Sequence, residues 1–304
     1  MDTKTIDQLL DRFETTGVVG EGNPRIKAIT RRLVRDLMIA IEDLDITAEE
    51  FWSGLDYFAE AGRNGELGLI APGIGLEHFL DLRLDEAEAR AGLQGGTPRT
   101  IEGPLYVAGA PVVQAEARLD DGNTPGEVVV MQGVVRSADG QPVAGAQVEV
   151  WHANDKGGYS YFDTTQSAFN LRRTIVADAQ GRYKFRSVMP VGYSCPPGGA
   201  TDRLLQQLGR HGHRPAHIHF FVSAPGHRKL TTQINIENDP HLWDDFAFGT
   251  RDGLVPKVFT NNDRAAMNAL NVDKPFYEIR FDFTLHAEKA DAPATDFDRP
   301  RAAA

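Results

Sequence analysis

The chain has 304 residues, of which 41% are hydrophobic and 25% charged, enough for one large globular domain or two that share a core. Its net charge of −11 offers no basic surface for nucleic acid. One cysteine, Cys195, cannot build a disulfide framework or a thiolate metal site, and no segment reads as a signal peptide or membrane span. We therefore expect a cytoplasmic protein.

The first third of the chain is predicted to be helical. Apolar residues fall at helical spacing over residues 6–13 and again over 26–41, where Asn23-Pro24 supplies a cap and a first-turn proline. Residues 47–50 form a capping box before a third helix, and a fourth is expected over 76–90. The apolar stripes are long, so we expect them to pack against the rest of the chain or against a second subunit.

The character of the sequence changes after residues 95–98. Residues 128–137 and 146–151 alternate with period two around the turn 138–140, which predicts a β-hairpin. Further strands are predicted at 173–177, 183–188, 217–222, 230–236 and 276–285. Turn signals at this spacing favour an antiparallel β-sandwich over a parallel sheet.

The predicted fold class is therefore α+β, in two sections. Residues 1–105 form the helical section. Residues 106–288 form the β-sandwich. Residues 289–304 are rich in Asp, Ala and Pro, which is typical of a disordered tail.

The motif from Arg214 to Val222 contains two histidines, His217 and His219. In a strand, residues i and i+2 point to the same face, so the two imidazoles are predicted to lie side by side. Two imidazoles on one face are a natural pair of ligands for a transition metal. A His-x-His pair with a purely structural role is about equally common.

Two glycine-flanked tyrosines, Tyr159 and Tyr193, follow predicted strands. A phenol has a pKa near 10, so it ligates only where a strong Lewis acid displaces its proton. Ferric iron can do so, and two phenolates with two neutral imidazoles would suit its charge. In an arbitrary protein, however, ordinary half-buried tyrosines would be the commoner explanation.

Long motifs of the chain resemble the intradiol ring-cleavage dioxygenases. They span residues 151–160, 168–173, 209–219 and 230–235, with a further match at 103–111. The resemblance extends from about residue 5 to residue 285, and it is strongest to the members of the family that act on catechol.

This resemblance implies a metal site and a reaction. One ferric iron per subunit would be held by Tyr159, Tyr193, His217 and His219, and O₂ would open catechol between its hydroxyls to give cis,cis-muconate in the β-ketoadipate pathway. It also implies that Tyr193 leaves the metal when substrate binds and takes up a proton. Arg214 and Gln233 would stabilise the negative charge that develops on the ring.

The resemblance further implies a substrate pocket and partners. The helical section 1–105 would supply a dimer contact and a lid over this pocket, and the β-sandwich 106–288 would carry the catalytic metal. The pocket would be apolar, with walls from Leu69, Pro72, Ile101, Pro104, Leu105, Phe246 and Ala247. Family members are commonly homodimers through the N-terminal helices, and several carry a phospholipid there.

Two alternatives remain at this stage. The first keeps the chemistry but changes the substrate to a chlorocatechol or to hydroxyquinol. The second is a non-catalytic β-sandwich binding module, because residues 133–150 resemble the strand-turn-strand unit of such modules.

Overall fold

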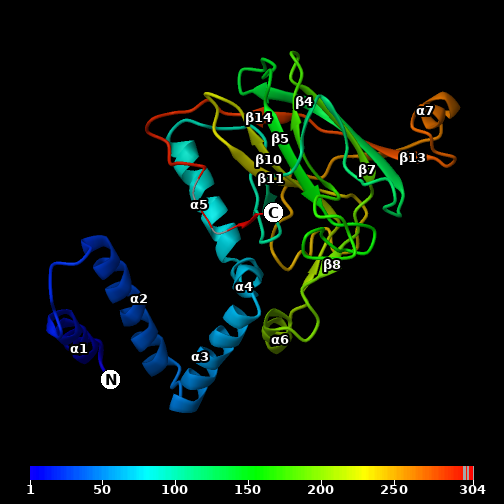
Figure 1. Ribbon diagram of the computed structural model, residues 1–304. Helices are drawn as coiled ribbons and strands as arrows, with labels where there is room; N and C mark the ends of the chain where they lie inside the picture. The colour runs from blue at the N-terminus through cyan, green and yellow to red at the C-terminus, as the bar shows by residue number, and fades with distance from the viewer. Residues whose placement is uncertain (297–298, 300, 304) are drawn as a thin grey trace. The chain divides into compact units, whose positions relative to one another are not determined.

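The computed structural model describes residues 1–296, 299 and 301–303, and the chain divides into two compact units, Met1–Asn64 and Gly65–Ala304 (Figure 1). The first unit holds α1 (Thr3–Thr15), α2 (Pro24–Asp43) and α3 (Ala48–Arg63). The second unit holds the β-sheets together with α4 (Leu67–Gly73), α5 (Leu76–Arg90), α6 (Ala200–Gln207) and α7 (Arg264–Ala269).

The predicted helix starts agree with the structure because local side chains fix them. Asn23 accepts hydrogen bonds from the backbone N–H groups of Arg25 and Ile26, and Pro24 is the first residue of α2. Thr47 and Glu50 form the reciprocal capping box before α3. The short helix α4 was not predicted, since seven residues around Pro72 carry no clear helical period.

The apolar stripe of α2 is exposed in the single chain. Ile26, Leu33 and Leu37 have exposed fractions of 58%, 64% and 49%, and no residue of α2 is buried. On α1, by contrast, Ile6 and Leu10 are buried.

The β-strands form two main sheets that enclose one apolar core. The first sheet has the strand order β11 (Leu230–Asn235), β10 (His217–Ser223), β5 (Gln147–His152), β6 (Arg172–Val176) and β2 (Val112–Gln114). The second has the order β12 (Val258–Asn261), β13 (Phe276–Arg280), β4 (Val128–Ser137), β7 (Arg182–Val188) and β3 (Glu116–Arg118), and β14 (Phe283–Leu285) also pairs with β4. Their inner faces bury a common cluster that includes Val129, Met131, Val148, Val150, Phe185, Ile218 and Phe220.

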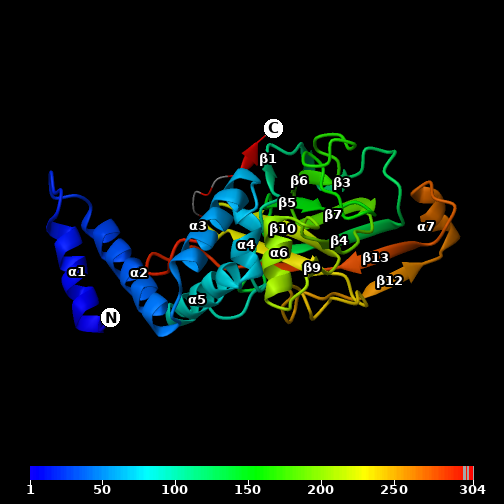
Figure 2. The same ribbon diagram turned by 90° about the horizontal axis from the view of Figure 1, so that it is seen from below.

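Two small strand pairs complete the described topology. β8 (Tyr193–Ser194) pairs with β9 (His213–Arg214), and β1 (Val107–Ala108) pairs with β15 (Ala302–Ala303) near the C-terminus (Figure 2). Helix α7 connects β12 to β13, and Figure 2 shows it at the end of these two strands of the second sheet.

The predicted hairpin of residues 128–137 and 146–151 is wrong, because β4 lies in the second sheet and β5 in the first. The chain does turn back briefly, where the N–H of Val143 donates to the carbonyl of Val135 at 2.8 Å. It then crosses to the other sheet at Ala146, which is buried. Crossing allows both strands to bury their apolar faces against each other across the sandwich, whereas a hairpin would place them in one layer.

The prediction of a purely antiparallel sandwich also needs correction. β4 pairs in parallel with β13 and β14, and the β2–β6 and β3–β7 pairs are parallel as well. The other predicted strands are present within two residues, except that residues 276–285 divide into β13 and β14. The break occurs at Phe281, whose carbonyl accepts a hydrogen bond from the Tyr183 hydroxyl at 2.8 Å.

The predicted section 1–105 does not coincide with either compact unit, since α4 and α5 group with the strands. Carboxylates explain this grouping. Glu66 accepts hydrogen bonds from the first N–H groups of α6, and Glu88 of α5 forms an ion pair with Arg228. These contacts join the helices to segments far along the chain. Sequence periodicity cannot reveal such contacts.

The described part of the predicted tail, residues 289–304, makes specific contacts. Arg299 forms an ion pair with Glu77, and Arg301 forms one with Glu102. Residues 297, 298, 300 and 304 of the tail lie outside the described residues. Among the residues that the structure describes, no helix has the length and apolar composition needed to cross a membrane.

Candidate metal centre

His217 and His219 lie on the outer face of the first sheet, opposite the sandwich core. The alternation along β10 sends Ile218 and Phe220 into the core and both imidazoles away from it. The two Nε2 atoms are 3.0 Å apart, and each residue is only 2% exposed. The two-residue period of the sequence therefore predicted the shared face correctly.

Both imidazoles are neutral, so each has one unprotonated nitrogen that can bind a metal. Burial, reinforced by the positive charge of Arg214, lowers the pKa of His217 to about 3. Burial and the neighbouring His217 lower the pKa of His219 well below its ordinary value. The Nδ1 of His217 lies 2.6 Å from the carbonyl of Pro215, so Nδ1 carries the proton and Nε2 presents its lone pair.

The His219 ring stacks on Trp151, with centroids 4.9 Å apart and planes 5° apart. Trp151 faces His219 across the β5–β10 pair. The Nδ1 of His219 is buried and has no hydrogen-bond partner among the described residues. Such a stack fixes the direction in which the ring nitrogen points.

Tyr159 joins the two histidines from the segment after β5. Its hydroxyl lies 3.3 Å from the Nε2 of His217, and the residue is 3% exposed. Burial, together with the neighbouring Tyr193, raises the pKa of Tyr159 well above its ordinary value. Without a cation the hydroxyl of Tyr159 is therefore neutral, and a phenolate there requires one.

Tyr193 completes the group from β8, where it is half-buried. Its ring centroid lies 5.5 Å from that of Tyr159 and 5.6 Å from that of His217. Gly157 makes room for it, because a Cβ at that glycine would lie 2.8 Å from the Cβ of Tyr193, and its φ of +79° also favours glycine. The pairing of β8 with β9 places Tyr193 opposite Arg214.

Arg214 brings fixed positive charge to the same group. Its Nη1 lies 3.1 Å from the Nε2 of His217, and its Nη2 donates to the Oε1 of Gln233 at 2.9 Å. Burial would lower the pKa of Arg214, but the carboxylate of Asp245, 3.0 Å away, raises it above the ordinary value. Gln233 is itself oriented by Asn235, whose Oδ1 accepts from its amide at 3.1 Å.

The predicted pocket residues are distributed over neighbouring clusters. Ile101, Phe246 and Ala247 are buried in one apolar cluster with Cys195 and Leu205. Leu105 packs against the cluster of Trp151 and Tyr159. Pro104 lies against α4, since a Cβ on Gly68 would be 3.0 Å from its side chain, and Leu69 and Pro72 belong to the same helix.

The donor set fits a hard, trivalent metal ion. Two neutral imidazole nitrogens and a phenol oxygen converge within hydrogen-bonding distance in a buried site, with a second phenol beside them. Phenolates can offset the charge of such an ion, and imidazoles suit iron. The two Nε2 atoms lie 3.0 Å apart, so the His219 ring can donate from Nε2 to His217 when no ion is present, and a bound ion would replace that contact.

Sequence reasoning missed two residues at this site, Asp245 and Arg172. Asp245 is separated from Arg214 by thirty-one positions, and no local pattern connects the two. Arg172 is 1% exposed, and its guanidinium lies 5.9 Å from the centre of the Tyr159 ring. In the sequence, the only sign of a role for Arg172 was its place in the pair of arginines that ends the 168–173 motif.

Comparison with known proteins adds independent information. A family model described as dioxygenase matches residues 101–287, and one described as catechol dioxygenase N terminus matches residues 23–92. Catechol 1,2-dioxygenase 2 of Acinetobacter lwoffii is 67% identical over 85% of this chain and 94% of its own length. The crystal structure of wild-type catechol 1,2 dioxygenase of Acinetobacter radioresistens superposes with a TM-score of 0.97 at 53% identity, covering 100% of this chain and 99% of that one. Hydroxyquinol 1,2-dioxygenase of a Rhizobium strain is 33% identical over 86% of this chain and 90% of its own length.

Proposed function

This chain belongs to the intradiol dioxygenase family, and we propose that it uses O₂ to cleave catechol between its two hydroxyl-bearing carbons. The product would be cis,cis-muconate, which places the reaction in aromatic-compound degradation through the β-ketoadipate pathway. One structural observation carries the proposal. Two neutral imidazoles and a buried tyrosine converge beside a second tyrosine and a charged arginine.

The residues that would hold one ferric iron are Tyr159, Tyr193, His217 and His219. When bound, ferric iron supplies a Lewis acid that draws electron density from the catechol oxygens and makes the ring reactive toward O₂. The buried imidazoles contribute neutral ligands at pH 7, because their pKa values lie far below that pH.

The two tyrosines are suited to different tasks. Tyr159 is almost fully buried against Trp151 and Arg172, which favours a fixed ligand. Tyr193 is half-buried on a two-residue strand, which leaves it freer to move. Tyr193 would therefore receive a proton of the incoming catechol at its phenolate oxygen, acting as a base.

Arg214 and Gln233 would stabilise the anionic substrate. Arg214 stays charged at any working pH, since Asp245 raises its pKa, and it lies directly beside His217. Its bond to Gln233 holds both polar groups on the same side of the site. Positioned donors of this kind act where negative charge develops, and burial increases their effect.

The apolar residues proposed as pocket walls would take the substrate ring. They are Leu69, Pro72, Ile101, Pro104, Leu105, Phe246 and Ala247, and the ring would be oriented by its two oxygens. The turnover of catechol, 4-chlorocatechol and hydroxyquinol should be compared directly. Catechol should be the best substrate, and failure to cleave it would favour the chlorocatechol or hydroxyquinol alternative.

Tyr193→Phe tests the metal centre, and Tyr161→Phe is its matched control. Charge transfer from tyrosinate to ferric iron should make the wild-type protein burgundy. Tyr193→Phe should lose or alter this absorption and lose turnover. Tyr161 is 40% exposed and lies in the same segment as Tyr159, so Tyr161→Phe should retain the absorption and the turnover. A fully active Tyr193→Phe protein would contradict the proposed site, and a colourless wild type without iron would favour a binding module.

The cytoplasmic location, the homodimer and a bound phospholipid are proposals as well. The exposed apolar stripe of α2 supports a contact with a second copy through the N-terminal helices. A cavity of about 360 Å³ between α1 and α2, lined by Leu10, Phe13, Ile26 and Val34 among others, could take an acyl chain. Native mass spectrometry should give twice the chain mass, and lipid extraction should release a phospholipid. A monomer without bound lipid would contradict both the dimer and the lipid proposal.

A further inference from the structure

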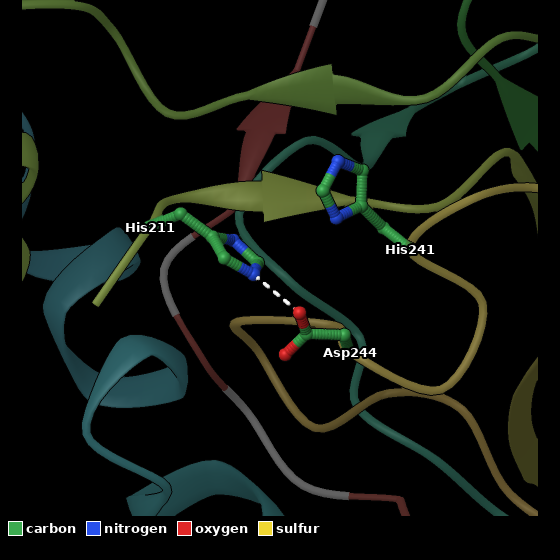
Figure 3. Close-up of side chains that lie close together, drawn as sticks. All are labelled: His211, His241 and Asp244. Carbon is green, nitrogen blue, oxygen red and sulfur yellow. Dashed lines mark hydrogen bonds and ion pairs between the residues drawn. The ribbon is translucent and has the colours of Figure 1, made fainter.

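We propose that His211, His241 and Asp244 form a second, surface metal site that binds zinc, separate from the iron site. His211 lies just before β9, and His241 and Asp244 lie in the segment that follows β11. Figure 3 shows the imidazole of His211 directed at the carboxylate of Asp244, with the ring of His241 nearby.

The distances suit one shared ion. One ligand atom from each residue lies within 4.8 Å of the other two. The Nε2 of His211 is 2.9 Å from the Oδ2 of Asp244, and the rings of His211 and His241 have centroids 4.9 Å apart. Ligands of a tetrahedral zinc are separated by about 3.4 Å, given bond lengths of about 2.1 Å, so modest side-chain rotation closes the site.

The group is open to ions in solution. The side chain of His211 is 34% exposed and that of Asp244 is 78% exposed. Three protein ligands leave a fourth position to water, as in many zinc sites.

His213 supports the site without belonging to the ligand group. Its ring stacks on that of His241, with centroids 4.7 Å apart and planes 9° apart. Its Nδ1 lies 2.6 Å from the hydroxyl of Ser194. This stack restrains the His241 ring, so the entropy lost on ordering that ligand when zinc binds is reduced.

The ligand types select zinc over the hard divalent ions. Two imidazoles and one carboxylate suit zinc, whereas calcium and magnesium prefer oxygen ligands throughout. One internal contact opposes binding. The Nδ1 of His211 accepts from the N–H of His213 at 3.1 Å, so the ring proton is on Nε2. Zinc at Nε2 requires that proton to move to Nδ1, which costs this bond and makes the site one of moderate affinity.

Zinc at this position would join two segments that carry an ion pair. Arg214 lies three residues beyond His211, and Asp245 follows Asp244 directly; their side chains are 3.0 Å apart. An ion that binds the folded chain and not the unfolded one raises stability by mass action. Zinc should therefore raise the unfolding temperature.

The test uses iron-loaded protein titrated with zinc chloride. Zinc binding is followed by calorimetry, zinc and iron contents are measured after dialysis, and unfolding temperature is recorded with and without zinc. The variants are His241→Gln, at a half-buried position, and Asp244→Asn, at an exposed one. His227→Gln is the matched control, since His227 is half-buried like His211 and His241 but lies outside this group.

We expect one zinc per chain in the wild type and in His227→Gln, with unchanged iron content and a raised unfolding temperature. In His241→Gln and Asp244→Asn the affinity should fall about tenfold or more, because a three-ligand site loses one ligand. Equal zinc binding by all four proteins, or none by the wild type, would overturn the proposal. Loss of iron in step with zinc uptake would overturn it too, since zinc would then be entering the iron site.

Discussion

At the scale of single residues, Asp245 controls the charge around the proposed iron site. It is buried, faces the guanidinium of Arg214 and accepts hydrogen bonds from the N–H groups of Ala247 and Gly249. Burial would raise the pKa of Asp245, but Arg214 lowers it below the ordinary value, so the pair stays ionised. An uncompensated charge at either end would be costly.

Asp245→Asn should lower kcat/KM for catechol about 10- to 100-fold, because Arg214 loses the anion that holds it beside His217. The iron absorption band should remain, since Asp245 is not a proposed ligand. Asp245→Glu should be more active than Asp245→Asn, because it keeps the carboxylate. Asp252 is exposed and close in sequence, so Asp252→Asn should leave kcat/KM unchanged. Full activity in Asp245→Asn would show that Arg214 is held by other means.

His152 makes stability depend on pH. Burial lowers its pKa to about 4, and its nitrogens lie 2.7 Å from the Ala153 carbonyl and the Ser187 hydroxyl. The folded chain keeps His152 neutral while the unfolded chain binds a proton below about pH 6.5. The free energy of unfolding should therefore fall as pH drops from 6.5 to 4, by about 3 kcal/mol for this group.

His152→Gln should weaken the dependence of the free energy of unfolding on pH. Urea unfolding of the wild type and the variant at pH 7 and at pH 4.5 measures this free energy. An identical pH dependence in the two proteins would exclude His152 as the cause.

At the scale of elements, the break between β13 and β14 depends on Gly133 of β4. A Cβ at Gly133 would lie 1.7 Å from the carbonyl oxygen of Phe281, so the backbone of that loop would have to move. The same carbonyl accepts from the Tyr183 hydroxyl, which ties it to β7. A side chain at Gly133 would therefore disturb several strands of the second sheet.

Gly133→Ala should lower the free energy of unfolding by about 3 kcal/mol through this clash. Gly140→Ala is the control: its φ is +86° and nothing lies within 4 Å of the position that a Cβ would take, so only backbone strain of about 1 kcal/mol is expected. Chemical denaturation of both variants measures the difference. Equal losses would mean that the loop at Phe281 adapts freely.

Elements with local signals were predictable, and those defined by distant pairing were not. The caps at Asn23 and Thr47 and the period of β10 are contained in a few consecutive residues. The separation of β4 from β5 depends on which sheet each strand joins, a choice made by contacts far along the chain. The β8–β9 pair consists of two residues a side and gives no periodic signal.

At the scale of the whole molecule, the candidate site combines both kinds of information. The shared face of His217 and His219 followed from strand alternation alone. Tyr159 lies in an irregular segment and Tyr193 on the two-residue strand β8, and charge balance together with the resemblance to a family singled them out. Asp245 was missed because its role depends on a buried ion pair with Arg214 that tertiary structure creates.

The most direct test of the account is the identity of the ring-opened product. Iron-loaded protein should be mixed with catechol under ¹⁸O₂ and the product analysed by mass spectrometry. We predict cis,cis-muconate that carries both atoms of the labelled oxygen. A product opened beside the diol, or no ring-opened product from iron-loaded protein, would contradict the account.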